Sequence, residues 1–275
     1  MLDRSPYIVI RTDASLKIGS GHVMRCLTLA EKLRESGADV SFVSRTHPGN
    51  LIDLIHQKEF VINELAVIET QSCNIIKEKE NESEYHSWLG TSQDQDANDT
   101  ISTFQEKRVD WLIVDHYGLG QVWEQQLRPH VGKIMVIDDM ANRLHDCDLL
   151  LDQNYFHDVE SRYEELVSPC CTKLLGPRYA LLRPEFAEER KHLKPRTGKV
   201  RSVFVFLGGT DPENETGKIL GALSDSELAH LEVVVVLGKT NPNLASIQKQ
   251  VALRPNTNLA VQSDNIAELM VRADI

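Results

Sequence analysis

A glycine-containing loop leads directly into a histidine within RTDASLKIGSGHVMRC, residues 11–26. Gly19 and Gly21 allow the backbone to turn tightly and to approach a ligand closely. His22 then falls in the first turn of the following helix, where free N–H groups and the positive end of the helix dipole disfavour a charged ring. A neutral imidazole can act as a general base. The alternative is a structural histidine at a helix start, and the spacing alone leaves both interpretations open.

Other polar side chains of this segment could contact a ligand. Arg25 lies three residues beyond His22, on the same face of the expected helix, where a guanidinium could hold a diphosphate or a carboxylate. The spacing matches neither GxGxxG nor a P-loop, so it does not by itself predict a nucleotide site. The candidate substrate contacts of the segment are Arg11, Asp13, Gly19, Gly21 and Arg25.

A second cluster, Asp115-His116-Tyr117-Gly118, follows the apolar run 111–114. Polar groups at the carboxyl end of a buried strand are typical of a site lining. Asp115 could orient an imidazole, His116 is a further candidate contact, and Tyr117 could hydrogen-bond a sugar or an attacking water. The alternative for Asp115 is a cap on the next helix.

Weaker candidates occur later in the chain. A turn that resembles a phosphate- or sugar-binding loop follows the apolar run 203–207, and its residues are Gly208, Gly209, Thr210 and Asp211. Arg183 is a candidate substrate contact, but a structural ion pair is the interpretation that we favour for it. Asp138-Asp139 could bind a metal, but no third ligand stands at a readable spacing, so we expect a capping or loop role. We therefore expect no metal and no cofactor.

The elements that must position these residues alternate between apolar runs and helical patterns. Continuous apolar runs predict strands covered on both faces, and hence a parallel sheet, at 7–10, 40–43, 111–114, 134–137 and 149–151. Helical spacing predicts helices at 22–36, around 51–55 and at 121–128. Residues 69–100 are polar, and we expect mostly a solvated surface loop, with one or two helices as the alternative and Trp88-Leu89-Gly90 as the anchored piece.

The pattern predicts two Rossmann-like α/β domains that face each other across a cleft. Residues 1–183 form the first domain, 184–201 a linker, and 202–275 a second domain with strands at 203–207, 233–237 and 259–261. Its helices are expected at 215–223, 244–251 and 266–271. Residues 273–275 look like the start of another strand, so we expect this second domain to be incomplete. Ligands of such sheets bind at the carboxyl ends of the strands.

Composition narrows the classes of function. The chain has 275 residues, of which 41% are hydrophobic and 26% charged, so it has material for large cores. Its formal net charge of -11 argues against general nucleic-acid binding. We see no signal peptide and no apolar run long enough to cross a bilayer. The cysteines are five, an odd number, and their positions match no metal-ligand spacing. We therefore interpret them as reduced thiols. We expect a cytoplasmic protein without a membrane partner.

The chain resembles a known enzyme family over nearly its whole length. The resemblance is carried, in this order, by RTDAS…IGSGHVMRCLTLAEKL, WLG, WLIVDHYG, DDMANRLHDCDLLLDQN, LLGPRYALLRPEF and FLGGTD. These segments closely resemble the PseG family, the UDP-2,4-diacetamido-2,4,6-trideoxy-β-L-altropyranose hydrolases of bacterial pseudaminic acid biosynthesis. That family has a glycosyltransferase-B-like fold, similar to MurG.

The resemblance implies roles for individual residues. His22 matches the family's catalytic base, which deprotonates water for attack at the anomeric carbon and releases UDP with inversion and without a metal. Tyr117 matches an active-site tyrosine, and Gly19 and Gly21 match the loop that lies against the diphosphate and sugar. The GGTD turn, residues 208–211, matches a turn of the nucleotide-binding domain. The family's segment beyond the position of Ile275, which holds UDP and supplies an asparagine, has no counterpart here.

Two other functions fit the sequence. One is a glycosyltransferase of the same fold, which passes the sugar to an acceptor instead of water. The other is an inactive fragment that only binds a nucleotide sugar. His22 within GxGH, with Arg25 three residues later and no basic membrane-docking patch in the first domain, favours the hydrolase. The expected partners are thus a UDP-sugar and water, and the free sugar is expected to serve pseudaminic acid biosynthesis, flagellin glycosylation and surface polysaccharide.

Overall fold

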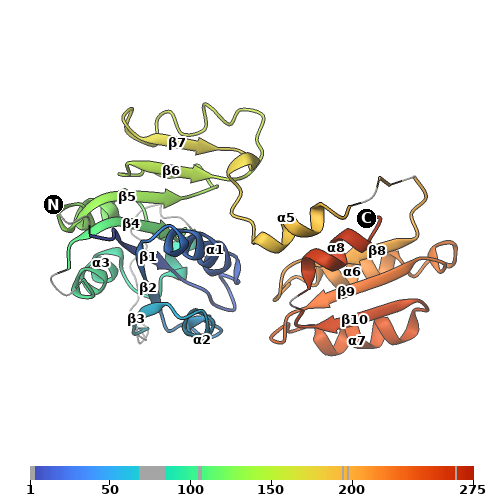
Figure 1. Ribbon diagram of the computed structural model, residues 1–275. Coiled ribbons are helices and arrows are strands. Elements are labelled where there is room, and N and C mark those ends of the chain that lie inside the picture. The colour runs from blue at the N-terminus through green and yellow to red at the C-terminus, as the bar shows by residue number, and fades with distance from the viewer. Residues whose placement is uncertain (1–3, 68–83, 105–106, 194, 197, 264) are drawn as a thin grey trace. The chain divides into compact units, whose positions relative to one another are not determined.

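The computed structural model describes residues 4–67, 84–104, 107–193, 195–196, 198–263 and 265–275. The chain divides into two compact units, Met1–Leu181 and Leu182–Ile275 (Figure 1). The division falls two residues before the expected end of the first domain. Helix α5, Pro184–Arg190, packs against α8, Ile266–Arg272, so the stretch expected to be a linker begins with a helix of the second unit.

The first unit is built on a parallel sheet, as the continuous apolar runs predict. Over the described residues it has seven strands in the order β3-β2-β1-β4-β5-β6-β7. The strands are β1 Tyr7–Thr12, β2 Asp39–Arg45, β3 Val61–Leu65, β4 Val109–Asp115, β5 Val131–Ile137, β6 Leu149–Asp152 and β7 Thr172–Leu175. The sequence did not predict β3 and β7, because these two edge strands are short and are exposed or half-buried along most of their length.

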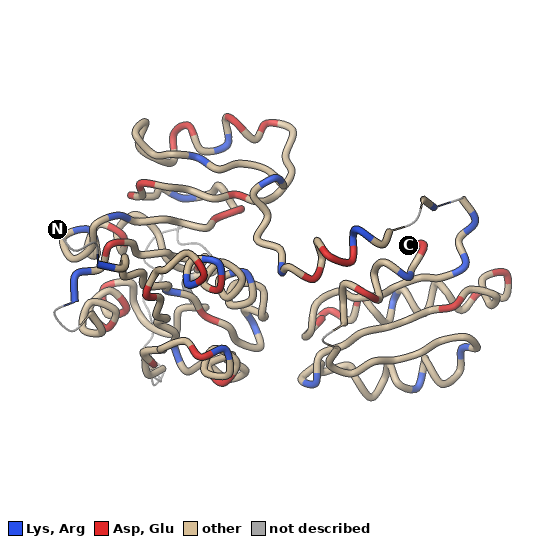
Figure 2. Tube along the Cα trace, viewed as in Figure 1, with Lys and Arg blue, Asp and Glu red and all other residues tan. Residues whose placement is uncertain are grey.

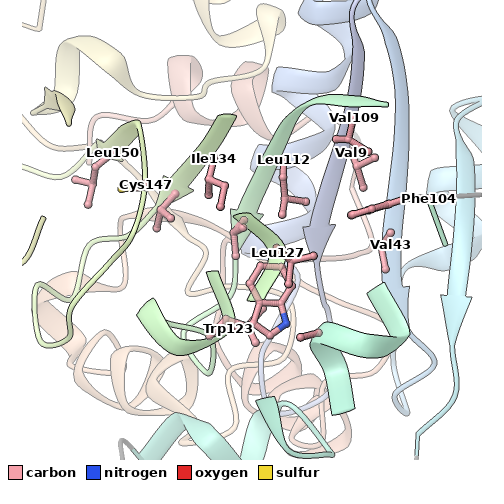
Figure 3. Close-up of a cluster of buried hydrophobic side chains, with 14 of the residues drawn as sticks. Val9, Val43, Phe104, Val109, Leu112, Trp123, Leu127, Ile134, Cys147 and Leu150 are labelled. Atoms are coloured by element: carbon pink, nitrogen blue, oxygen red, sulfur yellow. The ribbon is translucent and has the colours of Figure 1, made fainter. Parts of the chain in front are cut away.

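Helices cover both faces of this sheet. Helix α1, Gly21–Glu35, and α2, Ile52–Gln57, pack on one face through the same apolar cluster as Ile10 and Phe42. Helices α3, Gln93–Ser102, and α4, Gln121–Leu127, pack on the other face. In that second cluster Trp123 and Leu127 of α4 lie against the alternate residues of the central strands (Figure 3). The helical turns η1 Glu84–Trp88, η2 Arg128–His130 and η3 Pro177–Tyr179 complete this unit.

Helix α3 corrects the expectation of a solvated loop between residues 69 and 100. Residues 68–83 lie outside the described part of the chain, but the segment after them is helical and begins at Ser92, whose hydroxyl accepts the Gln95 N–H at 3.1 Å. Asp96, Ala97 and Thr100 share one buried face at helical spacing. The polar composition concealed this helix because its most important buried side chain is an aspartate. The expected anchor is present, since Leu89 is fully buried.

The second unit is a smaller α/β layer. Its described strands form a three-stranded parallel sheet in the order β10-β9-β8, with β8 Ser202–Val205, β9 Glu232–Leu237 and β10 Thr257–Val261. Besides α5 and α8 it contains α6 Glu215–Ala222, α7 Leu244–Leu253 and the turn η4 Ser226–Leu228. At its edge the Phe204 N–H donates to the Ile275 carbonyl at 2.8 Å, so the segment expected to start a strand pairs with β8.

Two properties concern the surface. Acidic and basic residues are interspersed along the trace of each unit (Figure 2). Within the described ranges, none of the helices combines the length and the apolar character needed to span a bilayer.

Candidate functional site

The glycine loop of the first unit is a tight turn at the carboxyl end of β1. The Gly19 N–H donates to the Ser15 carbonyl at 2.8 Å, and the Ser15 hydroxyl accepts the Lys17 and Ile18 N–H groups at 3.1 and 2.9 Å. Gly19 has a φ of +79°, a backbone conformation that residues with a side chain rarely adopt. A Cβ atom at Gly19 or Gly21 would meet no described atom within 4 Å. The loop is therefore closely folded and open on its outer side.

The start of α1 leaves hydrogen-bond donors free for a ligand. Ser20 is the N-cap residue, but its side chain forms no capping hydrogen bond. The first backbone hydrogen bond runs from the Met24 N–H to the Ser20 carbonyl, so the earlier N–H groups have no partner within the helix. The first turn also carries no acidic residue. An anion placed here would meet free N–H groups and the positive end of the helix dipole.

His22, Arg25 and Asp115 form one hydrogen-bonded group. Nδ1 of His22 lies 2.6 Å from Oδ1 of Asp115, which is fully buried at the end of β4. Arg25 donates from Nη2 and Nε to the two oxygens of the same carboxylate, each at 2.6 Å. Cys26 adds a weaker Sγ contact to Asp115 at 3.4 Å. Asp115 thus orients the His22 imidazole, and Arg25, whose predicted contact with a substrate stays a prediction, binds the same carboxylate.

The charges of this group determine which ring nitrogen is free. Burial alone would raise the pKa of Asp115, but His22 and Arg25 outweigh it and hold the pKa far below its usual value. An ionised carboxylate can only accept hydrogen bonds, so the short contact requires a proton on Nδ1 of His22. Within the described chain no hydrogen bond occupies Nε2 of that ring. A neutral His22 therefore carries a lone pair on Nε2, which is what a general base needs.

Tyr117 packs directly on this histidine. Its ring meets the His22 ring edge-to-face, with 4.5 Å between centroids, and its hydroxyl donates to Oδ1 of Asp139 at 2.6 Å. Burial and the hydrogen bond to Asp139 raise the pKa of Tyr117, so the phenol keeps its proton. Tyr85 and Trp88 of η1 also pack on Tyr117, and their ring centroids lie 5.3 and 5.9 Å from the Tyr117 centroid.

Asp139 is a site residue that the sequence interpretation missed. We expected Asp138 and Asp139 to cap or to line a loop, and Asp138 does accept the Ala141 N–H at 2.9 Å. Asp139 instead lies beside the catalytic candidates and accepts hydrogen bonds from Tyr117 and from Nδ2 of Asn154, the latter at 3.0 Å. Its position after a buried strand was the available signal. No group of three or more candidate metal ligands occurs among the residues with described positions.

Arg11 and Asp13 lie inside the protein rather than at an open surface. Both side chains are fully buried, and Arg11 donates from its two terminal nitrogens to Asp13 at 2.6 and 2.9 Å. Arg11 and Arg45 both donate to Oδ2 of Asp96 on α3 at 2.7 Å. Trp123 completes the cluster with a 3.1 Å hydrogen bond to Asp96. This buried ion cluster fixes the carboxyl end of β1, immediately before the glycine loop.

His116 connects the cluster to the segment that carries Tyr117. Its Nδ1 accepts the Gly118 N–H at 3.0 Å, which places the proton of a neutral ring on Nε2. That nitrogen faces Oδ2 of Asp13 at 3.4 Å. Burial lowers the pKa of His116, although Asp13 acts in the opposite direction. His116 is 2% exposed, so it supports the site from within.

The remaining candidates belong to the second unit. Gly208 has a φ of +86° and open space where a Cβ would be, whereas Gly209 accepts the Gly238 N–H at 2.9 Å. Thr210, the next residue in the turn, is partly buried. The Asp211 carboxylate accepts the Glu215 and Thr216 N–H groups at 2.9 Å, so it caps α6. These contacts lower the pKa of Asp211 against the effect of burial.

Arg183 forms an ion pair in this second unit. One of its terminal nitrogens lies 2.9 Å from Oε1 of Glu185, and its guanidinium lies over the Phe186 ring at 5.2 Å. The structural alternative that the sequence left open for Arg183 is therefore the one observed. Its predicted contact with a substrate stays a prediction.

Solved structures show the class of fold. MurG of Acinetobacter baumannii aligns with 98% of this chain and 71% of its own, with a TM-score of 0.57 and 14% identity. UGT2 of Phytolacca americana, complexed with UDP-2-fluoro-glucose and pterostilbene, covers 97% and 73%, with a TM-score of 0.54 and 13% identity. The protein thus has the two-domain α/β fold of glycosyltransferase-B enzymes.

Sequence relatives define the family within that class. The chain is 31% identical over 264 residues to the UDP-2,4-diacetamido-2,4,6-trideoxy-β-L-altropyranose hydrolase of Campylobacter jejuni, covering 96% of this chain and 81% of the relative. The chain belongs to this hydrolase family. The spore coat polysaccharide biosynthesis protein SpsG of Bacillus subtilis is 20% identical over 270 residues, covering 98% of this chain and 70% of its own. A search with protein-family models gave no match.

Proposed function

We propose that this protein hydrolyses a UDP-linked diacetamido-trideoxy sugar at its anomeric carbon and releases UDP and the free sugar. The family relationship supports a UDP-sugar hydrolase. The observation that carries the reaction is the 2.6 Å contact of Asp115 with Nδ1 of His22, because it leaves Nε2 as the basic atom. The free sugar would be used in pseudaminic acid biosynthesis.

The reaction is a single displacement. Nε2 of His22 accepts a proton from water as the water oxygen forms a bond to the anomeric carbon. The bond from that carbon to the β-phosphate oxygen breaks, and UDP leaves with the electron pair. Attack opposite to the leaving group inverts the configuration. The Asp115 carboxylate stabilises the positive charge that develops on His22, and the step uses side chains and water alone.

The other candidates act around this centre. The free N–H groups of α1 and the loop with Gly19 and Gly21 are proposed to contact the diphosphate and the sugar. Arg25 helps to hold Asp115 and is partly accessible for the substrate, with a side chain 12% exposed. Arg11, Asp13 and His116 support the loop from inside. The turn at 208–211 of the second unit is proposed to hold part of the nucleotide.

The test is hydrolysis in the absence of any acceptor. The purified protein is incubated with the UDP-sugar, and released UDP is quantified over time. His22→Ala should lower kcat by about 10²- to 10⁴-fold, the usual contribution of a general base. His192→Ala is the matched control, because His192 is an exposed histidine of the second unit.

Two results would reject the proposal. UDP release that requires an added acceptor sugar would instead identify a glycosyltransferase of the same fold. UDP binding by calorimetry without turnover under any condition would identify a nucleotide-sugar-binding protein. Unaltered turnover in His22→Ala would reject the proposed base even if hydrolysis occurs.

A further inference from the structure

Tyr117 has a single hydroxyl proton, and that proton is directed to Asp139. Its oxygen lies 2.6 Å from Oδ1 of Asp139, close enough for a strong hydrogen bond to a carboxylate. The raised pKa of Tyr117 keeps the phenol protonated, so the phenol donates and Asp139 accepts. The only hydrogen bonds that the Tyr117 oxygen can still form are those in which it accepts.

Asp139 has two further polar neighbours. Its Oδ2 accepts Nδ2 of Asn154 at 3.0 Å and lies 3.6 Å from Nη1 of Arg25. Tyr117 and Asn154 thus both donate to this carboxylate, and the Arg25 guanidinium lies beside it. Because Arg25 also holds Asp115, the same guanidinium links both carboxylates of the site. The Tyr117 hydroxyl therefore points to a carboxylate that its neighbours hold in place.

Two acceptors consequently belong to rings that are in direct contact. Nε2 of His22 carries a lone pair, the Tyr117 oxygen offers only lone pairs, and the two rings are in edge-to-face contact at 4.5 Å. A water molecule held by both would direct one proton to each. Its own lone pairs would then point away from both rings and be available to an electrophilic carbon.

We propose that Asp139 is a positioning residue for the hydrolysis: by accepting the Tyr117 proton, it makes the tyrosine an acceptor for the attacking water. Asp139 does not touch the reacting atoms and acts through Tyr117. This inference rests on the proposed function. It assigns to Tyr117 the orientation of the nucleophile and to His22 the removal of its proton.

The test compares Asp139→Asn, Tyr117→Phe and the double variant, with steady-state kinetics of UDP release. The asparagine can turn its N–H₂ group toward the tyrosine, which then donates its own proton into the site. Each single variant should lower kcat by about 10- to 100-fold and leave KM nearly unchanged, because water orientation matters in the transition state. The double variant should be no slower than Tyr117→Phe alone.

Controls separate this inference from folding and from the proposed function. Asp158→Asn changes an exposed aspartate and should match wild type. Asn154→Ala removes one donor to Asp139 without removing the carboxylate. It should lower kcat modestly in the wild-type background and not at all in Tyr117→Phe.

The outcomes are distinct. A wild-type protein that does not hydrolyse the UDP-sugar rejects the proposed function. With an active wild type, additive losses in the double variant would overturn the role of Asp139. The same conclusion follows if Asp139→Asn raises KM at unchanged kcat, since the residue would then bind substrate. Unfolding midpoints equal to that of wild type confirm that the variants are folded.

Discussion

At the scale of single residues, Asp115 is the group on which the site depends. It accepts hydrogen bonds from His22, Arg25 and Cys26, and it is fully buried. One carboxylate thus fixes the tautomer of His22, the proposed base, and the orientation of the Arg25 guanidinium. Few substitutions can preserve both functions.

Asp115→Asn should lower kcat by about 10³- to 10⁴-fold with a smaller effect on KM. An asparagine can turn its N–H₂ group toward Nδ1 of His22, which stabilises the tautomer with its proton on Nε2 and removes the base. The measurement is UDP release by the variant across pH 6 to 9. Cys26→Ser keeps a donor to Asp115 and serves as the control. A kcat within threefold of wild type would show that Asp115 does not set the tautomer.

Sequence reasoning found individual residues more readily than their partners. The position of His22 after two glycines and of Asp115 and Tyr117 after a buried strand indicated chemistry, because helix starts and strand ends meet at one edge of a parallel sheet. The pairing of Tyr117 with Asp139 could not be predicted. It depends on which loops converge after folding, and an aspartate after a strand equally well caps a helix.

At the scale of elements, α3 has a function that its composition hides. The helix contributes Asp96 to the buried ion cluster, where it neutralises Arg11 and Arg45. The Arg11 side chain is entirely buried, so loss of an ionic partner there is costly. Burial would raise the pKa of Asp96, but Arg11 and Arg45 lower it, so the carboxylate is ionised.

Asp96→Ala should destabilise the first unit by about 3–5 kcal/mol, because it removes the buried carboxylate that Arg11 and Arg45 share. Asp94→Ala, on the same helix, removes only an exposed hydrogen bond to Gln126 and should cost less than about 1 kcal/mol. Urea unfolding of both variants measures the difference. Equal effects would mean that the ion cluster contributes no stability beyond that of a surface contact.

The strands and helices of regular pattern followed from the sequence. Continuous apolar runs located β1, β4 and β5, since strands covered on both faces need apolar residues at every position. The edge strands β3 and β7 escaped detection because one face of each is exposed or half-buried. Helix α3 escaped because period and polarity gave opposite indications.

At the scale of the molecule, the two units can be followed separately. All three tryptophans, Trp88, Trp111 and Trp123, belong to the first unit, so their fluorescence reports its unfolding alone. That unit also contains the buried ion cluster and His116. Its stability should therefore depend on pH in a way that tryptophan fluorescence can isolate.

We expect the free energy of unfolding of the first unit to fall in two stages as the pH decreases. The pKa of His116 is lowered by burial, so the unfolded chain takes up a proton first, below about pH 6.5, and is favoured. Burial would raise the pKa values of Asp13 and Asp96, but Arg11 and the other donors around each carboxylate together lower them. Their contribution is complete above about pH 4 and is lost as the pH falls through the folded values.

Urea titrations at pH 7.5, 5.5, 4.0 and 3.0, followed by tryptophan fluorescence, test this dependence. His116→Gln should reduce the change between pH 7.5 and 5.5, because glutamine does not titrate. A wild-type stability that is constant between pH 7.5 and 3.0 would contradict both stages.

The bond between Nδ1 of His22 and Asp115 also has a consequence for the second half of each turnover. The proton gained by the ring cannot continue to Asp115, whose pKa is held far below its usual value. It must leave from Nε2, the atom at which it arrived. The histidine side chain is 8% exposed, and in the proposed reaction a bound product would leave that atom little access to bulk solvent. In the proposed reaction, regeneration of the base is thus tied to product departure: His22 is reset when the emptied site refills with solvent.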